Sequence, residues 1–113
     1  MKKFYFFAVV SLTLLSCSNN VPKCDDPEIL QTVIDLMREQ DGMLKEWKFM
    51  GKNFEELELD LIKTNSIDKE LNKCECEASI KNGPPFTKNP TILYEAQTNS
   101  NGDVIITTYP VNW

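Results

Sequence analysis

The spacing of apolar residues changes in the middle of this chain, and that change limits the folds that the sequence can adopt. Between residues 27 and 50 the apolar residues recur at intervals of three and four, which is typical of amphipathic helices. From residue 55 onward they alternate with polar residues in four successive segments, which is typical of half-buried strands. A helical region followed by consecutive strands predicts an α+β fold, in which a four-stranded antiparallel meander packs on one long N-terminal helix.

That long helix is predicted to begin after Asp26, a natural N-cap, with Pro27 at the first helical position, where a missing N–H has no partner to lose. Gly42 is expected to cap its C-terminal end. Five residues at helical spacing should form its buried stripe: Ile29, Leu30, Val33, Ile34 and Met37.

A second, short helix is predicted over residues 43–50, with Gly51 ending it. Four residues would lie on its apolar face: Met43, Leu44, Trp47 and Met50. Packing against the domain is the favoured role of this face, and a docking edge rich in methionine and tryptophan is the alternative.

The four strands are predicted over residues 55–64, 73–80, 91–98 and 104–111. Leu57, Leu59 and Leu61 should share the buried face of the first strand, and four residues should do so in the second: Cys74, Cys76, Ala78 and Ile80. The predicted connections are a polar stretch at 65–72, a proline-broken loop at 81–90 and a turn at 99–103 with Asn101-Gly102 at its tip. Pro110 should end the last strand or mark it as an edge.

The N-terminal seventeen residues have the pattern of an export signal. Lys2 and Lys3 precede about a dozen mostly apolar residues, a run too short for a transmembrane helix. The stretch that follows, Leu14-Leu15-Ser16-Cys17, resembles the lipobox of bacterial lipoproteins. An ordinary signal peptide with a chance cysteine is the alternative.

The lipoprotein resemblance implies how the chain is processed and where it resides. Residues 1–16 would be removed as a signal peptide, Cys17 would carry the lipid, and residues 17–23 would form a tether to a single domain at 24–113. Several acyl chains anchor a protein stably where one chain would be marginal. Ser18 is not the aspartate of the inner-membrane retention signal, so the resemblance implies the cell envelope, on the outer membrane facing the periplasm.

If Cys17 carries the lipid, three cysteines remain in an oxidising compartment. A Cys74–Cys76 bond would be strained, because residues two apart in a strand lie about 6.6 Å apart at Cα, near the upper limit for a disulfide. We therefore expect a structural disulfide from Cys24 to Cys76, with Cys74 as the alternative partner of Cys24. The closed loop of about fifty residues would contribute roughly 4 kcal/mol to stability. A three-thiolate metal site and a thiol-exchange centre are less favoured, because the chain has no histidine, no fourth available thiolate and no Cys-x-x-Cys motif.

Acidic residues concentrate on one face of the predicted sheet. Removing residues 1–16 would take two of twelve basic residues and none of seventeen acidic ones, which leaves a net charge of −7 on 97 residues. Such a charge disfavours nucleic acid and anionic lipid surfaces as partners. The candidate partner-binding residues are Glu58, Asp60, Glu75 and Glu77, with Glu95 joining them if Ile92, Tyr94 and Ala96 point inward. A solvated surface, a site for a basic protein and a calcium site are the three interpretations of this face.

The sequence offers little for catalysis. It has no histidine, no G-x-S-x-G motif and no phosphate-binding glycine loop, so we expect no enzymatic activity and no cofactor. Two functions fit what remains. The first is a non-catalytic protein-binding module of the envelope, of the inhibitor or immunity type. The second is a structural or assembly accessory of an envelope secretion or conjugation machine, docking through the sheet edge or the Trp47 segment.

Overall fold

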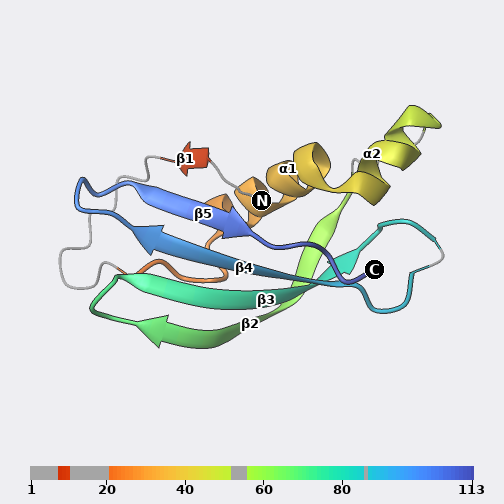
Figure 1. The fold of residues 1–113 in the computed structure, drawn as a ribbon. Coiled ribbons are helices and arrows are strands. Elements are labelled where there is room, and N and C mark those ends of the chain that lie inside the picture. Colours follow the sequence, from red (N-terminus) through yellow and green to blue (C-terminus); the bar gives the residue numbers. More distant parts are fainter. Residues whose placement is uncertain (1–7, 11–20, 52–55, 86) are drawn as a thin grey trace.

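The structure is a computed structural model of residues 1–113, and it describes residues 8–10, 21–51, 56–85 and 87–113. Its elements are β1 (Ala8–Val10), α1 (Pro27–Gln40), α2 (Gly42–Phe49), β2 (Glu58–Asp68), β3 (Lys73–Lys81), β4 (Thr91–Thr98) and β5 (Val104–Thr108). Strands β2 to β5 form the predicted antiparallel meander, and both predicted helices are present on one side of it (Figure 1). The α+β fold is therefore confirmed.

A strand that the sequence did not predict extends the sheet to the order β1-β5-β4-β3-β2. Strand β1 pairs with β5 in antiparallel orientation, and it comes from the stretch expected to be the signal peptide. Cys17 and the expected tether up to residue 20 lie outside the described residues. Neither helix in the described part of the chain is long and apolar enough to cross a membrane.

Helix α1 begins as predicted and ends differently. Asp26 caps it, because its carboxylate accepts a hydrogen bond from the Glu28 N–H at 2.9 Å. The predicted stripe is buried except for Leu30, which is half-buried, and Leu36 joins it. The prediction that Gly42 caps the C-terminal end of α1 was wrong. Asp41 ends α1 in an extended conformation, and its carboxylate caps α2, so Gly42 is the first residue of the next helix.

Helix α2 packs less tightly than its sequence predicts. Leu44 is its one buried residue, while Met43 and Trp47 are half-buried. Met50 is 70% exposed, so its predicted place on the packed face was wrong. The helix ends near Gly51 as expected, and that glycine has a φ of 90°, in the left-handed region.

Strand β2 differs most from its prediction. It runs to Asp68, so the connection expected at 65–72 is shorter than predicted. Its pairing with β3 is irregular between Asp60 and Lys63 and again between Thr64 and Ser66. Leu61, inside the first irregularity, has a φ of 51° and is 75% exposed, so its predicted burial beside Leu57 and Leu59 was wrong.

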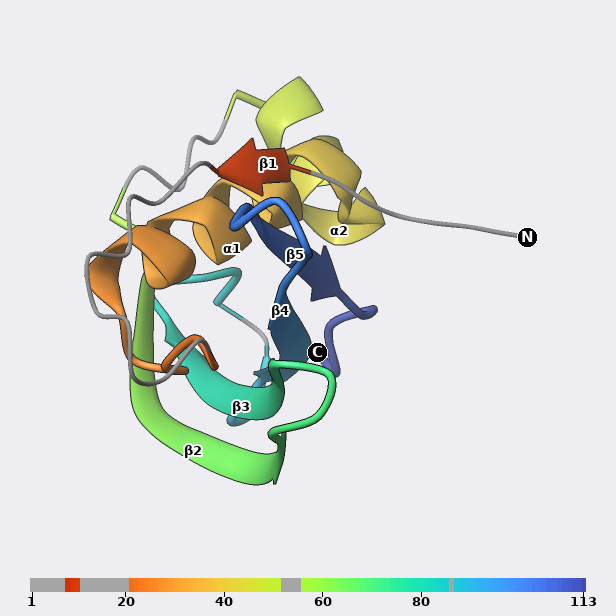
Figure 2. The same cartoon turned by 90° about the vertical axis from the view of Figure 1, so that its left-hand side faces the viewer.

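The core lies between α1 and the helix-facing side of the meander, which curves beneath α1 (Figure 2). Strands β3, β4 and β5 alternate between this side and solvent, and the inward-facing side chains include the predicted set of β3. The tip of the β4–β5 turn is formed as predicted, with Gly102 at a φ of 88°. On the opposite side of the sheet, which we call the outer face, the described residues form no helix (Figure 1).

Candidate functional site

Three cysteines meet where the chain enters α1. Cys24 and Cys76 form a disulfide across 52 residues of sequence, which is the pairing favoured from the sequence. Cys74 is a buried free thiol, and its sulfur lies 3.5 Å from that of Cys76. Burial raises the pKa of the Cys74 thiol, because an apolar surrounding disfavours the thiolate. The Cys24–Cys76 disulfide is therefore a structural cross-link, which we call the staple, and burial protects the remaining thiol of Cys74.

The three cysteine sulfurs lie as close together as the ligands of a metal ion, but they are not three free thiolates. The three sulfurs lie within 4.8 Å of one another, the one such group of potential ligands among the residues that the structure describes. Thiolates bind soft metals, but two of these sulfurs are joined in the disulfide. A buried tyrosine adds to the staple, since the Tyr94 hydroxyl donates a hydrogen bond to the Cys24 carbonyl at 2.8 Å.

The predicted acidic residues lie on the outer face, where the strand register divides them into two groups. Glu58 and Asp60 lie at one end of it, opposite Lys81 and Ser79. The Lys81 ammonium is 2.7 Å from the Asp60 carboxylate and lowers the pKa of that carboxyl. Lys81 therefore offsets one of the two carboxylate charges at this end.

The second group surrounds a hollow in the middle of the outer face. Glu75 on β3 and Glu95 on β4 are directly opposite each other in the register, and residues opposite one another point to the same face of a sheet. Five residues line the hollow with their outward-facing side chains: Asn65, Glu75, Leu93, Glu95 and Tyr109. Its volume is about 230 Å³, which gives room for one long side chain. We call these five residues the outer-face hollow.

Hydrogen bonds hold the carboxylates of this region in place. The Tyr109 hydroxyl donates to Glu95 at 2.6 Å, and the Asn65 amide donates to Glu77 at 3.4 Å. The bond to Glu95 and partial burial raise the pKa of Tyr109 to about 12, since ionisation would place two negative charges side by side. Tyr109 therefore remains protonated at neutral pH and acts as a hydrogen-bond donor.

The lysines near the hollow offset its charge only weakly. Lys73 is 3.8 Å from Glu75, and Lys63 is 3.9 Å from Glu77. The Lys63 side chain is exposed and the Lys73 side chain is half-buried. Surface ion pairs of this length contribute about 0–1 kcal/mol. The hollow thus combines a pair of carboxylates with the apolar surfaces of Leu93 and Tyr109.

Sequence reasoning found part of this hollow. Glu75 was a candidate, and Glu95 was a conditional one whose condition holds, because Ile92, Tyr94 and Ala96 are buried. The candidate Glu77 does not line the hollow and accepts a hydrogen bond from Asn65. Asn65, Leu93 and Tyr109 were missed. The Asn101-Gly102 turn offered the signal, since its register places Tyr109 beside Leu93, where the Tyr109 N–H bonds to the Leu93 carbonyl at 3.0 Å.

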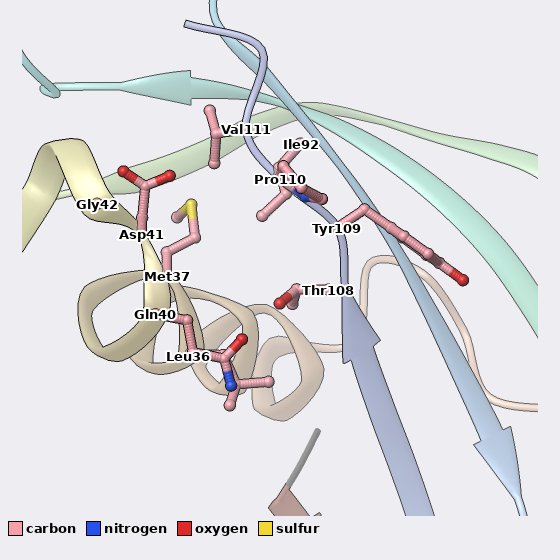
Figure 3. Close-up of a pocket in the computed structure, with 10 residues that line it drawn as sticks. All are labelled: Leu36, Met37, Gln40, Asp41, Gly42, Ile92, Thr108, Tyr109, Pro110 and Val111. Atoms are coloured by element: carbon pink, nitrogen blue, oxygen red, sulfur yellow. The ribbon is translucent and has the colours of Figure 1, made fainter. Parts of the chain in front are cut away.

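A second cavity lies on the helix-facing side, between the end of α1 and the chain that follows β5 (Figure 3). Its volume is about 290 Å³, and Leu36, Met37 and Ile92 supply much of its apolar lining. Asp41 is at its rim, where its carboxylate accepts hydrogen bonds from the Leu44 N–H and the Trp113 indole at 3.0–3.1 Å. We call this space the α1 cavity.

Comparisons with known proteins add no assignment. The chain matches no protein-family model, no curated protein sequence and no solved structure.

Proposed function

We propose that this protein is a non-catalytic binding module of the bacterial cell envelope, and that its outer-face hollow receives a lysine or arginine side chain of a partner protein. The direct opposition of Glu75 and Glu95 is the observation that carries the proposal. Like charges on neighbouring strands destabilise a sheet, and a partner's cation would relieve that repulsion. The hydrocarbon part of the same side chain would lie against Leu93 and Tyr109.

A charge-matched capture experiment tests this role. The domain from residue 18 onward is immobilised in three forms: unchanged, Glu75→Gln/Glu95→Gln, and Glu39→Gln/Glu46→Gln. The control pair removes the same charge from exposed positions on α1 and α2. We expect quantitative mass spectrometry of envelope extracts to find proteins that the unchanged and control domains retain and the hollow variant loses. Equal capture by all three forms would contradict the proposal.

We also propose that Cys17 carries a lipid anchor, on the strength of the Leu14-Leu15-Ser16-Cys17 resemblance. Cys17→Ser in the full chain should abolish labelling by a clickable palmitate analogue and move the protein out of the membrane fraction. Labelling that persists in this variant would refute the anchor. For the unchanged protein we expect fractionation with the outer membrane in a Gram-negative host, and recovery in the inner membrane would contradict that placement.

An assembly accessory of an envelope machine is the second candidate function. It is favoured by the end of α2, where Phe49 and Met50 are exposed on the surface. Exposed apolar side chains of this size at a helix end are suited to docking against another protein. In the capture experiment this function predicts retained proteins that are insensitive to Glu75→Gln/Glu95→Gln and are lost on Phe49→Ser.

A further inference from the structure

The two edges of the four-stranded meander are protected to different degrees. Strand β2 is interrupted by two register irregularities and carries the exposed Lys63. Bulges and edge lysines are the usual devices that prevent an exposed strand from pairing with another chain. Strand β5, at the other edge, has neither: Val104–Thr108 contains no charged residue and pairs with β4 in unbroken register.

Backbone hydrogen-bonding groups of β5 point out of the meander at alternate residues. The Tyr109 N–H bonds to Leu93, so Thr107 and Ile105 also direct their N–H groups toward β4. The N–H and C=O groups of Val104, Ile106 and Thr108 therefore face the opposite way, toward the open edge. This edge offers three aligned pairing positions.

Strand β1 is an example of a segment that pairs with the β5 edge. Ala8–Val10 pairs with it in antiparallel orientation, with Ala8 opposite Ile106 and Val10 opposite Val104. Both views place β1 beside β5, on the side of the sheet that carries α1 (Figures 1 and 2). The occupant is an extended, uncharged Ala-Val-Val segment.

The α1 cavity adjoins the β5 edge beyond the residues of β5 that pair with β1. Thr108 lines this cavity, and it follows Ile106 by two residues on the helix-facing side of β5 (Figure 3). In an antiparallel ligand strand, the residue two positions before the partner of Ile106 would lie opposite Thr108, and its side chain would point to the same side of the sheet. A large apolar side chain at that position would enter the cavity.

We propose that the mature protein binds an extended apolar segment of a second protein at this β5 edge. The segment runs antiparallel to β5, takes the place of β1, and inserts one large apolar side chain into the α1 cavity. The inference rests on the proposed removal of residues 1–16, which vacates the edge. The β5 edge is then a second binding surface, besides the outer-face hollow. It recognises the backbone and the apolar side chains of a partner, and not its charge.

The test uses the domain from residue 18 onward, which retains every residue of the core cluster and the Cys24–Cys76 disulfide. The probe is a synthetic peptide of residues 2–12, KKFYFFAVVSL. Saturating peptide should slow amide hydrogen exchange of Val104, Ile106 and Thr108 by about tenfold or more, as expected for newly formed ladder hydrogen bonds. The full chain with Cys17→Ala, which should keep its leader, should protect the same amides without added peptide.

Matched peptides separate strand pairing from other modes of binding. Ala8→Pro removes an N–H that faces β5 and should abolish protection, whereas Val9→Pro removes one that faces away and should preserve most of it. Phe6→Ala should weaken binding, because this residue is two positions before Ala8 and would lie opposite Thr108. The Glu75→Gln/Glu95→Gln domain should bind the peptide as well as the unchanged domain, so failure of the outer-face hollow would not affect this result.

Three outcomes would overturn the proposal. The first is the absence of protection at the β5 edge. The second is equal protection by the Ala8→Pro and Val9→Pro peptides, which would mean that no strand forms. The third is protection that rises with protein concentration in the absence of peptide, which would make a second copy of this chain the occupant.

Discussion

The Glu95 carboxylate contributes to the negative charge of the outer-face hollow and also fixes the position of a neighbouring side chain. It lies opposite Glu75 and accepts the hydrogen bond of the Tyr109 hydroxyl at 2.6 Å. The bond fixes the aromatic ring beside the carboxylate pair, so a cation entering the hollow would meet preorganised groups. A tyrosine that donates a hydrogen bond to a carboxylate also reports on the state of the site through its own titration.

Tyr109 should therefore titrate abnormally in the folded domain. Its pKa is raised to about 12 by Glu95, so the neutral phenol stabilises the native state fully below pH 10, and this contribution is lost as the pH rises through 12. The domain from residue 18 has only Tyr94 and Tyr109, and burial raises the pKa of Tyr94 as well. Absorbance at 295 nm should show little tyrosinate below pH 11.

Glu95→Gln is the matched variant for that titration, because it keeps an acceptor oxygen and removes the charge. The Tyr109 midpoint should fall toward 10 in this variant while the second tyrosine is unchanged. An identical titration curve for both proteins would show that Glu95 does not control Tyr109.

The cysteines make a second prediction at this scale. The domain from residue 18 should contain one disulfide and one thiol by mass, and native Cys74 should resist iodoacetamide because it is buried with a raised pKa. Cys24→Ala and Cys76→Ala should each lower the free energy of unfolding by roughly 3–4 kcal/mol, as loss of a cross-link over 52 residues implies. Cys74→Ala should cost only about 1 kcal/mol. Equal losses for Cys74→Ala and Cys76→Ala in urea denaturation would contradict the pairing.

At the scale of elements, one aspartate organises the junction of the two helices. Asp41 ends α1, and its carboxylate accepts hydrogen bonds from the Leu44 N–H and the Trp113 indole. The same residue thus joins the helices to the C-terminal end of the chain, 72 residues away in sequence. The wall of the α1 cavity depends on this junction.

Asp41→Ala should lower the free energy of unfolding by about 1–2 kcal/mol, because the cap of α2 and the indole hydrogen bond are both lost. Asp41→Asn keeps a capping oxygen and should cost less than half as much. Chemical denaturation of the two variants provides the comparison. Equal losses would mean that the carboxylate, and not its capping geometry, holds the junction.

The elements also show which parts of the fold the sequence determines locally. Strands β3 and β4 follow their alternation, and the start of α1 follows Asp26 and Pro27, since each signal lies in a few adjacent residues. The exposure of Leu61 was not predictable, because a φ of 51° is unfavourable for leucine and arises from pairing with β3. The helix end at Asp41 was missed because Trp113 and the cap of α2 select it. The outer-face hollow was missed in part because its members come from three strands and the residue after β5.

At the scale of the whole molecule, the helices and the outer face divide the surface into two sides. The helices cover one side of the meander (Figure 1). The hollow lies on the other side, toward which its lining side chains point. The β5 edge lies between these sides, and the α1 cavity lies on the helix-facing side. Under the proposed anchoring at Cys17, the domain would present the hollow and the edge to envelope proteins from one fixed position.

The role of the outer-face hollow is tested most directly by the association kinetics of a protein captured in a hollow-dependent way. Glu75→Lys/Glu95→Lys is compared with Glu39→Lys/Glu46→Lys, which changes the net charge equally on the helices. Exposed charges are screened over about 8 Å at physiological ionic strength, so the hollow contributes chiefly through steering at short range. We predict that only the hollow variant associates more slowly, at least about tenfold at low salt, and loses the salt dependence of the unchanged domain. If a folded hollow variant associates at the original rate with the original salt dependence, the outer face is a solvated surface and the partner binds elsewhere.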